Sequence, residues 1–115
     1  MANAIRGELN IELGGSTYKT KLNLNSIMVL ERNLGRSLIK VTQTLSTGDL
    51  QLSELLQVLQ TALKGGGNDL SDADVKKLVW EAGYVDALAA VGNILTNTLT
   101  GDEELDEGKQ EAVNQ

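Results

Sequence analysis

The spacing of apolar residues changes once along this chain, near residue 25. From residue 9 to 13, and again from residue 18 to 24, apolar and polar residues alternate. A period of two is typical of a strand with one buried face. Gly14-Gly15-Ser16 separates the two runs and predicts a turn, because glycine reaches positive φ without steric cost. The segment is therefore predicted to form a β-hairpin.

The outer face of this hairpin is predicted to be charged. Glu8 and Glu12 lie on the polar side of the first strand, and Lys19 and Lys21 on the polar side of the second. Opposite charges across two strands are favourable. Both glutamates are therefore expected to lie opposite lysines. A hairpin alone is marginally stable in water, so it is expected to pack on helices.

After residue 25 the apolar residues recur every three or four positions, which is typical of amphipathic helices. N-caps are expected at Asn25 or Ser26, Ser37, Ser53 and Ser71, and helix ends at Gly35, Gly48, Gly65, Gly83 and Gly101. A last helix from about Tyr84 to Leu99 is expected to bury Tyr84, Leu88, Val91, Leu95 and Leu99. The predicted fold class is α+β, an N-terminal hairpin followed by about five short helices.

Residues 102–115 differ in composition from the rest of the chain. They hold six acidic residues and one lysine, a net charge of −5, whereas the preceding 101 residues hold nine basic and ten acidic residues, a net of −1. We therefore expect one domain over residues 1–101 and a disordered acidic tail over residues 102–115. The favoured interpretation of the tail is a solubilising extension. The alternative is that it occupies an apolar groove or repels like-charged chains during assembly.

The chain contains no cysteine and no histidine. This removes disulfides, thiolate nucleophiles, the usual general base and the commonest metal ligands. Neither acidic cluster, from Asp69 or from Asp102, matches a calcium-binding loop. The glycines at residues 65–67 lack the preceding strand and the Gly-Lys-Ser/Thr ending of a phosphate-binding loop, so a linker is favoured. We expect no enzyme activity, no metal and no cofactor.

Nucleic-acid and membrane partners are not expected either. No basic stripe interleaved with aromatic residues is present. No apolar run approaches the roughly 20 residues that span a bilayer, and residues 1–6 lack the apolar region of a secretory signal. A cytoplasmic location is the expectation.

Two of the three aromatic residues, Trp80 and Tyr84, are four positions apart, and Leu88 follows at the same spacing. On a helix continuing through Gly83 these residues would share one face. Burial in the core is favoured, since a chain with one tryptophan normally buries it. The functional alternative is a protein-binding hot spot, because Trp and Tyr are frequent at such sites. A related hypothesis is that the apolar helix faces complete their burial in a homo-oligomer or on a protein partner.

The order of these segments resembles a known family of small phage proteins. The matching positions are Ala2-Asn3, Arg6-Gly7-Glu8, the Gly14-Gly15 turn, Tyr18, Leu30-Glu31, Gly35, the helix ending in Leu63-Lys64-Gly65-Gly66-Gly67, Leu70-Ser71-Asp72, Val75, Ala82-Gly83-Tyr84, Ala89, Leu95 and Gly101. Together they cover residues 2–101. The chain is similar to tail assembly chaperones of phages and of phage-derived gene transfer agents, which some descriptions call tail tube proteins.

The resemblance implies a role in building a phage tail, in the cytoplasm of a bacterial host. Proteins of this kind bind the long tape measure protein and keep it soluble until the tube polymerises around it. Apolar helical grooves would suit such a partner. Two alternatives stay open. One is a structural tail tube subunit, which two predicted strands suit poorly, and the other is a small regulatory binding domain.

Overall fold

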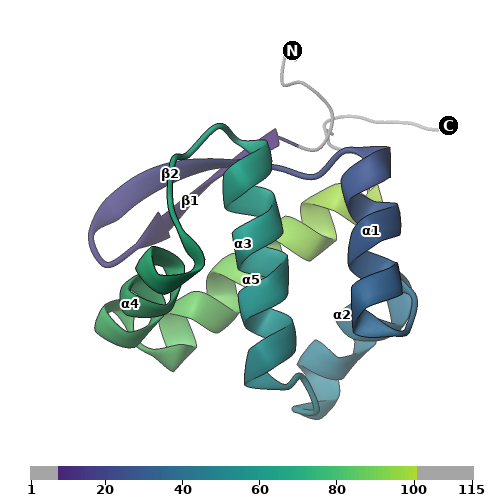
Figure 1. The fold of residues 1–115 in the computed structure, drawn as a ribbon. Coiled ribbons are helices and arrows are strands. Elements are labelled where there is room, and N and C mark those ends of the chain that lie inside the picture. Colours follow the sequence, from purple (N-terminus) through teal and green to yellow (C-terminus); the bar gives the residue numbers. More distant parts are fainter. Residues whose placement is uncertain (1–7, 101–115) are drawn as a thin grey trace, which may run out of the picture.

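The computed structural model describes residues 8–100, and the tail at residues 102–115 lies outside them. The described chain holds one antiparallel hairpin followed by five helices, as the α+β prediction states (Figure 1). The elements are β1 (Glu8–Leu13), β2 (Ser16–Lys21), α1 (Leu24–Leu34), α2 (Leu38–Thr47), α3 (Leu52–Gly65), α4 (Asp72–Ala82) and α5 (Tyr84–Thr100).

The hairpin turns over two residues, Gly14 and Gly15, with φ of 60° and 86°. Both values lie in the left-handed region that glycine adopts readily. Because Ser16 pairs with Leu13, it belongs to β2 rather than to the turn. Glu8 lies opposite Lys21, as expected, but Glu12 lies opposite Thr17, so the expected lysine partner for Glu12 is wrong. The observed turn is one residue shorter than the expected Gly14-Gly15-Ser16, and it sets this pairing of β1 with β2.

Helix α1 begins two to three residues earlier than expected. The Oδ1 atom of Asn23 accepts a hydrogen bond from the Ser26 backbone N–H over 2.8 Å, so Asn23 is the N-cap in place of Asn25 or Ser26. Gly35 ends the helix in the left-handed conformation, as predicted. Leu24 is consequently the first helical residue, not the last strand residue, and its side chain is 73% exposed.

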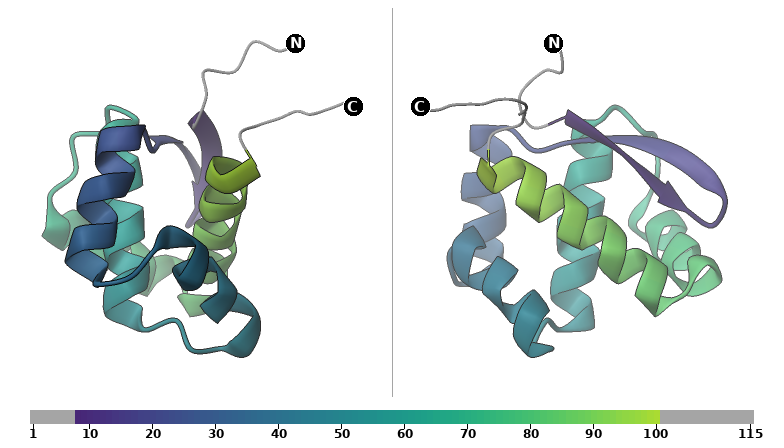
Figure 2. Two further views of the ribbon diagram at one scale, coloured as in Figure 1. Left: turned by 90° about the vertical axis from the view of Figure 1, so that its right-hand side faces the viewer. Right: turned by 180° about the vertical axis from the view of Figure 1, so that it is seen from behind.

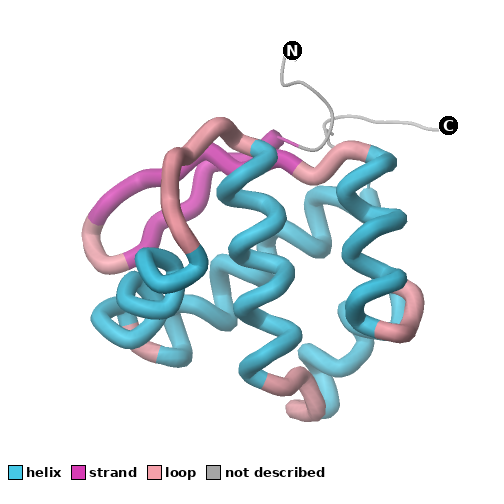
Figure 3. Tube along the Cα trace, viewed as in Figure 1, coloured by secondary structure: helices cyan, strands magenta, loops and turns pink. Residues whose placement is uncertain are grey.

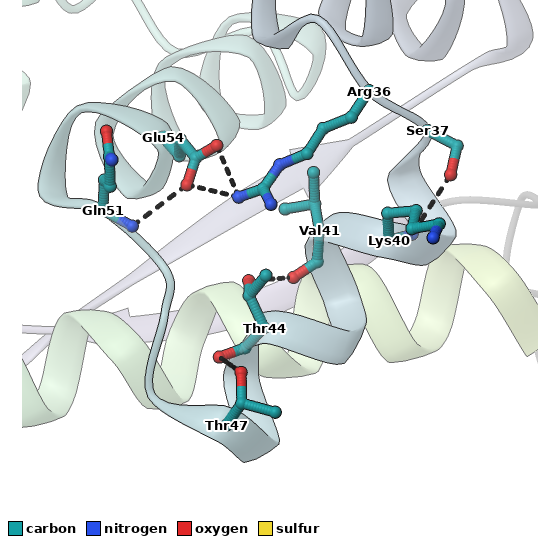
Figure 4. A network of polar contacts seen from close by, with 8 residues as sticks. All are labelled: Arg36, Ser37, Lys40, Val41, Thr44, Thr47, Gln51 and Glu54. Carbon is teal, nitrogen blue, oxygen red and sulfur yellow. Dashed lines mark hydrogen bonds and ion pairs between the residues drawn. The ribbon is translucent and has the colours of Figure 1, made fainter.

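Helix α2 has the predicted boundaries. The Ser37 Oγ accepts from the Lys40 N–H over 3.1 Å, and Gly48 ends the helix. An ion pair joins the connection before α2 to the first turn of α3 (Figure 4). One guanidinium nitrogen of Arg36, Nη2, lies 2.6 Å from both carboxylate oxygens of Glu54. Because Arg36 precedes α2 and Glu54 lies in α3, this contact closes the loop of chain that contains α2.

Helix α3 begins at Leu52, and its N-cap is Gln51 rather than the predicted Ser53. The Glu54 carboxylate accepts the Gln51 N–H over 3.0 Å, which satisfies a backbone donor that no earlier turn of helix can reach. Leucine, valine and alanine side chains of α3 form the centre of the core; they are Leu55, Val58, Leu59, Ala62 and Leu63.

The glycines that end α3 lie directly against the edge of β2. A Cβ atom on Gly65 would come within 2.1 Å of the Lys21 carbonyl oxygen, and one on Gly66 within 2.0 Å of the Lys19 carbonyl oxygen. The Asn68 amide then donates to the Lys19 carbonyl over 2.7 Å. This segment is therefore a close-packed connection that covers a sheet edge.

Helix α5 crosses behind α3 and runs along β1 (Figures 1 and 2). Its buried residues are Ala87, Ala90, Val91, Ile94 and Leu95. The prediction is right for Val91 and Leu95 but wrong for Tyr84 and Leu99, which are exposed. The buried face includes two alanines, whose small side chains let the helix approach its neighbours closely. At its far end, the Asn97 amide donates to the Glu8 carbonyl over 3.2 Å.

Figure 3 shows the hairpin packed against the helices. The buried apolar side chains between these elements form one core. Ile11 and Leu13 of β1 enter it from the hairpin, and Leu30, Leu38 and Val41 enter it from α1 and α2. Each Å² of apolar surface that the core removes from water stabilises the fold by roughly 25 cal/mol.

Candidate protein-binding groove

An apolar hollow of the described surface lies where the start of α3 meets the end of α4 and the start of α5. Its volume is about 500 Å³. Apart from one lysine its walls are almost entirely apolar; the lining residues are Leu52, Leu56, Lys76, Val79, Trp80, Gly83 and Tyr84. We call this hollow the elbow groove. Its size and composition suit apolar side chains of a partner.

The elbow itself is made by Gly83. The α4 helix ends when the Gly83 N–H donates to the Val79 carbonyl over 2.9 Å. Gly83 then adopts a φ of 94° and a ψ of 154°, a conformation that L side chains rarely adopt. The next helix leaves at an angle of 117° to α4. A single glycine therefore permits the bend between two walls of the groove.

The break at Gly83 changes how Trp80 and Tyr84 are related. They do not share a face of one continuous helix; Trp80 lies in the last turn of α4 and Tyr84 begins α5. Both still line the elbow groove. Their side chains are 87% and 48% exposed, so the expectation of burial in the core is wrong. Both aromatic residues therefore lie at the surface beside the groove rather than in the core.

Leu88, the third residue of the predicted set, lies elsewhere. It is half-buried, packs against the core and does not line the groove. The structure thus brings together Trp80 and Tyr84 but not Leu88. Whether any of these residues binds a partner stays a prediction.

Sequence reasoning missed the wall that α3 contributes. Leu52 is 51% exposed and Leu56 is half-buried, and both line the groove. A signal was present, because the first turns of α3 carry leucines at 52, 55 and 56, more than one buried stripe requires. The spacing could not show that α4 would lie beside them, since that contact joins residues more than twenty positions apart.

The charged groups around the groove are few. Lys76 lies in its wall, and the exposed carboxylates of Glu81 and Asp86 follow Trp80 and Tyr84 in the sequence. Within residues 8–100, no three acidic side chains converge on a possible metal site. Over the same residues no single helix could cross a membrane by length and apolar character, although α4 and α5 would meet that test as a bent pair.

Comparison with known proteins gives one finding. Residues 6–101 match a protein-family model described as phage tail tube protein, GTA-gp10. No curated protein and no solved structure matches the chain.

Proposed function

Because the chain belongs to the phage tail tube family described as GTA-gp10, we propose that it serves tail building by binding another tail protein in the elbow groove. Family membership gives the coarse role, a protein of phage tail structure or assembly. The observation that carries the finer proposal is Trp80, which is 87% exposed beside an apolar hollow. A large aromatic side chain in that position is typical of a binding hot spot.

The partner we propose is the tape measure protein, for which the chain would act as an assembly chaperone in the host cytoplasm. A long, coiled-coil-prone protein carries apolar stripes along its helices. A groove between helices receives such a stripe by the helix-in-groove mode, with anchors at helical spacing. Leu52, Leu56 and Val79 supply apolar walls, and Trp80 and Tyr84 supply a rim with polar ring atoms.

A second candidate function is a structural tail tube subunit. The description of the family names a tail tube protein, and it fits this alternative better than the chaperone. The described residues offer one two-stranded hairpin, and one of its edges is already covered by the end of α3. Little sheet is left to line a tube, which is why we prefer the chaperone. The family match gives no support to a small regulatory domain.

Co-expression with the tape measure protein tests the proposal. We expect a soluble complex on size-exclusion chromatography with light scattering for the wild-type chain, and its loss for Trp80→Ala. Leu99→Ala is the matched control, because Leu99 is also an exposed apolar residue of a helix but lies far from the elbow. A complex that persists unchanged in Trp80→Ala would exclude the groove as the binding site.

Particle composition separates the two candidates. A chaperone is expected in substoichiometric amounts, or not at all, in purified tails measured by quantitative mass spectrometry. A tube subunit is expected in many copies per tail. Many copies per tail would establish the chain as a structural tail tube subunit.

A further inference from the structure

One side of α1 exposes apolar side chains next to a positive charge. Leu24 and Met28 are four positions apart, so they lie on the same side of the helix, and they are 73% and 53% exposed. Arg32, a further four positions along, is exposed and extends this row. Val29, next to Met28 in the sequence, is also exposed. We call Leu24, Met28, Val29 and Arg32 the α1 face.

A hollow of about 420 Å³ adjoins the α1 face, between the first turn of α1 and the end of α3. Val29 belongs to its lining, Lys64 is its one charged lining residue, and none of the described residues that line it is acidic. In addition, α1 has no acidic side chain in its first turn, whereas α4 has Asp72 and Asp74 there. Lys64 and the dipole of α1 therefore both favour a carboxylate supplied from elsewhere.

The two ends of the described molecule differ in charge. Residues 24–47, which contain α1 and α2, hold three basic residues and one acid, a net of +2. Residues 69–86, which contain α4 and the start of α5, hold five acids and two lysines, a net of −3. Figures 1 and 2 place α1 and α2 at one end and α4 at the other. An acidic segment is therefore attracted to the α1 end and repelled from the end that holds the elbow groove.

Such a segment follows α5 in the same chain. Residues 102–115 carry a net charge of −5 and include one leucine, Leu105. They follow the last residue of α5, Thr100, after a single glycine, and α5 ends at the same end of the molecule as α1 (Figures 1 and 2). Fourteen extended residues reach at most about 50 Å. The 11 residues of α1 form a helix about 16 Å long, so the segment can follow α1 over its whole length.

We propose that residues 102–115 of the same chain cover the α1 face. Their carboxylates lie around Arg32 and Lys64, and Leu105 covers Leu24 and Met28. Each exposed ion pair of this kind is weak. Because the segment is joined to α5, however, its effective concentration at the α1 face is in the millimolar range, so weak pairs suffice to hold it there.

This contact would keep the apolar side chains of α1 from other chains until a partner that binds more strongly displaces the segment. The inference goes beyond the proposed function, since the elbow groove lies at the other end of the molecule. It is tested on the purified chain alone, so its failure would leave the binding of the tape measure protein untouched. Failure of the co-expression experiment would, in turn, leave this contact untouched.

Nuclear magnetic resonance with a spin label tests the contact. The chain contains no cysteine, so Gly108→Cys gives a single labelling site within the acidic segment and keeps its charge. A nitroxide attached there broadens the amide signals of residues that it approaches. We expect broadening in α1 and little in α4. High salt should weaken it, since the Debye length falls from about 10 Å at 0.1 M to about 3 Å at 1 M.

Charge reversals in the spin-labelled chain test the basic residues. Arg32→Glu and Lys64→Glu should each reduce the broadening in α1 about two- to fivefold, as the loss of an exposed ion pair does. Lys77→Glu is the matched control, because it makes the same change of charge at an exposed position of α4. It should leave the broadening in α1 nearly unchanged. Circular dichroism confirms that the variants are folded.

Three results would overturn the proposal. One is broadening in α4 as strong as that in α1, and another is an equal effect of Lys77→Glu and Arg32→Glu. The third comes from a mixture of spin-labelled chain with isotopically labelled wild-type chain, in which only contacts between copies are seen. Broadening in α1 as strong as within the single chain would show that the acidic segment binds a second copy instead.

Discussion

Val79 and Trp80 are adjacent in α4 but have opposite surroundings, since Val79 is buried and Trp80 projects into solvent beside the groove. A truncation at an exposed position removes little packing, so Trp80→Ala should change the free energy of unfolding by less than about 0.5 kcal/mol. Leu59→Ala, at a fully buried position, should cost about 2–5 kcal/mol. Urea denaturation compares them. A large loss in Trp80→Ala would mean that the ring supports the fold rather than a partner.

Two glycines with opposite constraints give a second prediction at this scale. Gly66 has an ordinary φ of −80° but no room for a Cβ, whereas Gly48 has a φ of 77° and nothing within 4 Å of the added atom. Gly66→Ala should cost about 3 kcal/mol, as overpacking against a backbone carbonyl does. Gly48→Ala should cost only about 1 kcal/mol, the strain of a left-handed alanine. Thermal unfolding would rank them. Equal costs would contradict the close contact with β2.

At the scale of the element, the first turn of α4 is fixed by reciprocal hydrogen bonds. The Ser71 N–H donates to Asp74 Oδ2 over 3.0 Å, and the Asp74 N–H donates to Ser71 Oγ over 3.1 Å. The hydrogen bond from the Ser71 backbone, followed by the Ser71 hydroxyl, holds the pKa of Asp74 below its ordinary value of 3.8. The predicted N-cap at Ser71 is thereby confirmed.

A lowered pKa in the folded state has a definite consequence for pH dependence. The ionised carboxylate of Asp74 stabilises the fold above the unfolded pKa, and that contribution is lost as the pH falls through the lower folded value. Asp74→Asn should therefore destabilise the chain at neutral pH and lose less stability than the wild type on acidification. Urea unfolding at neutral and acidic pH measures both effects. Asp72→Asn, in the same turn without the reciprocal bonds, should show a smaller change.

The pair between Arg36 and Glu54 makes a similar prediction for α2. Glu54→Ala removes the carboxylate that binds both the guanidinium and the Gln51 N–H. We expect a loss of about 1.5–3 kcal/mol, as for hydrogen bonds to charged groups. Faster amide exchange should be concentrated in α2 and its two connections. Uniform acceleration over the whole chain would show that the pair does not hold α2 locally.

How far the sequence predicts the elements depends on whether the signal is local. Ser37, Gly48 and Ser71 act on backbone groups within four residues, and their roles could be predicted. Asn23 and Gln51 were missed because neighbouring polar residues offered equally good caps. For the groove, the break at Gly83 was visible, but its 117° angle was not. That angle depends on tertiary packing, which the local sequence does not show.

At the scale of the whole molecule, the only tryptophan lies at the proposed contact. Its fluorescence should change little when urea unfolds the monomer, because Trp80 is already 87% exposed. It should shift to shorter wavelength when the chain binds the tape measure protein, since the ring then leaves water. Emission spectra of the chain alone and of the co-expressed complex measure this. An unchanged emission wavelength of Trp80 in the complex would contradict the elbow groove as the binding site.

The packing of β1 along α5 has a consequence for how the protein is made. The first strand and the last helix of the described chain are held together, and the Asn97 amide reaches back to the Glu8 carbonyl. During synthesis the hairpin emerges from the ribosome long before α5 does, so its apolar face has no final partner while the intervening helices are translated. The core closes only after almost every described residue has been added. Folding of this part of the chain is therefore expected to finish only once α5 has emerged, at a step that joins the two ends of the fold.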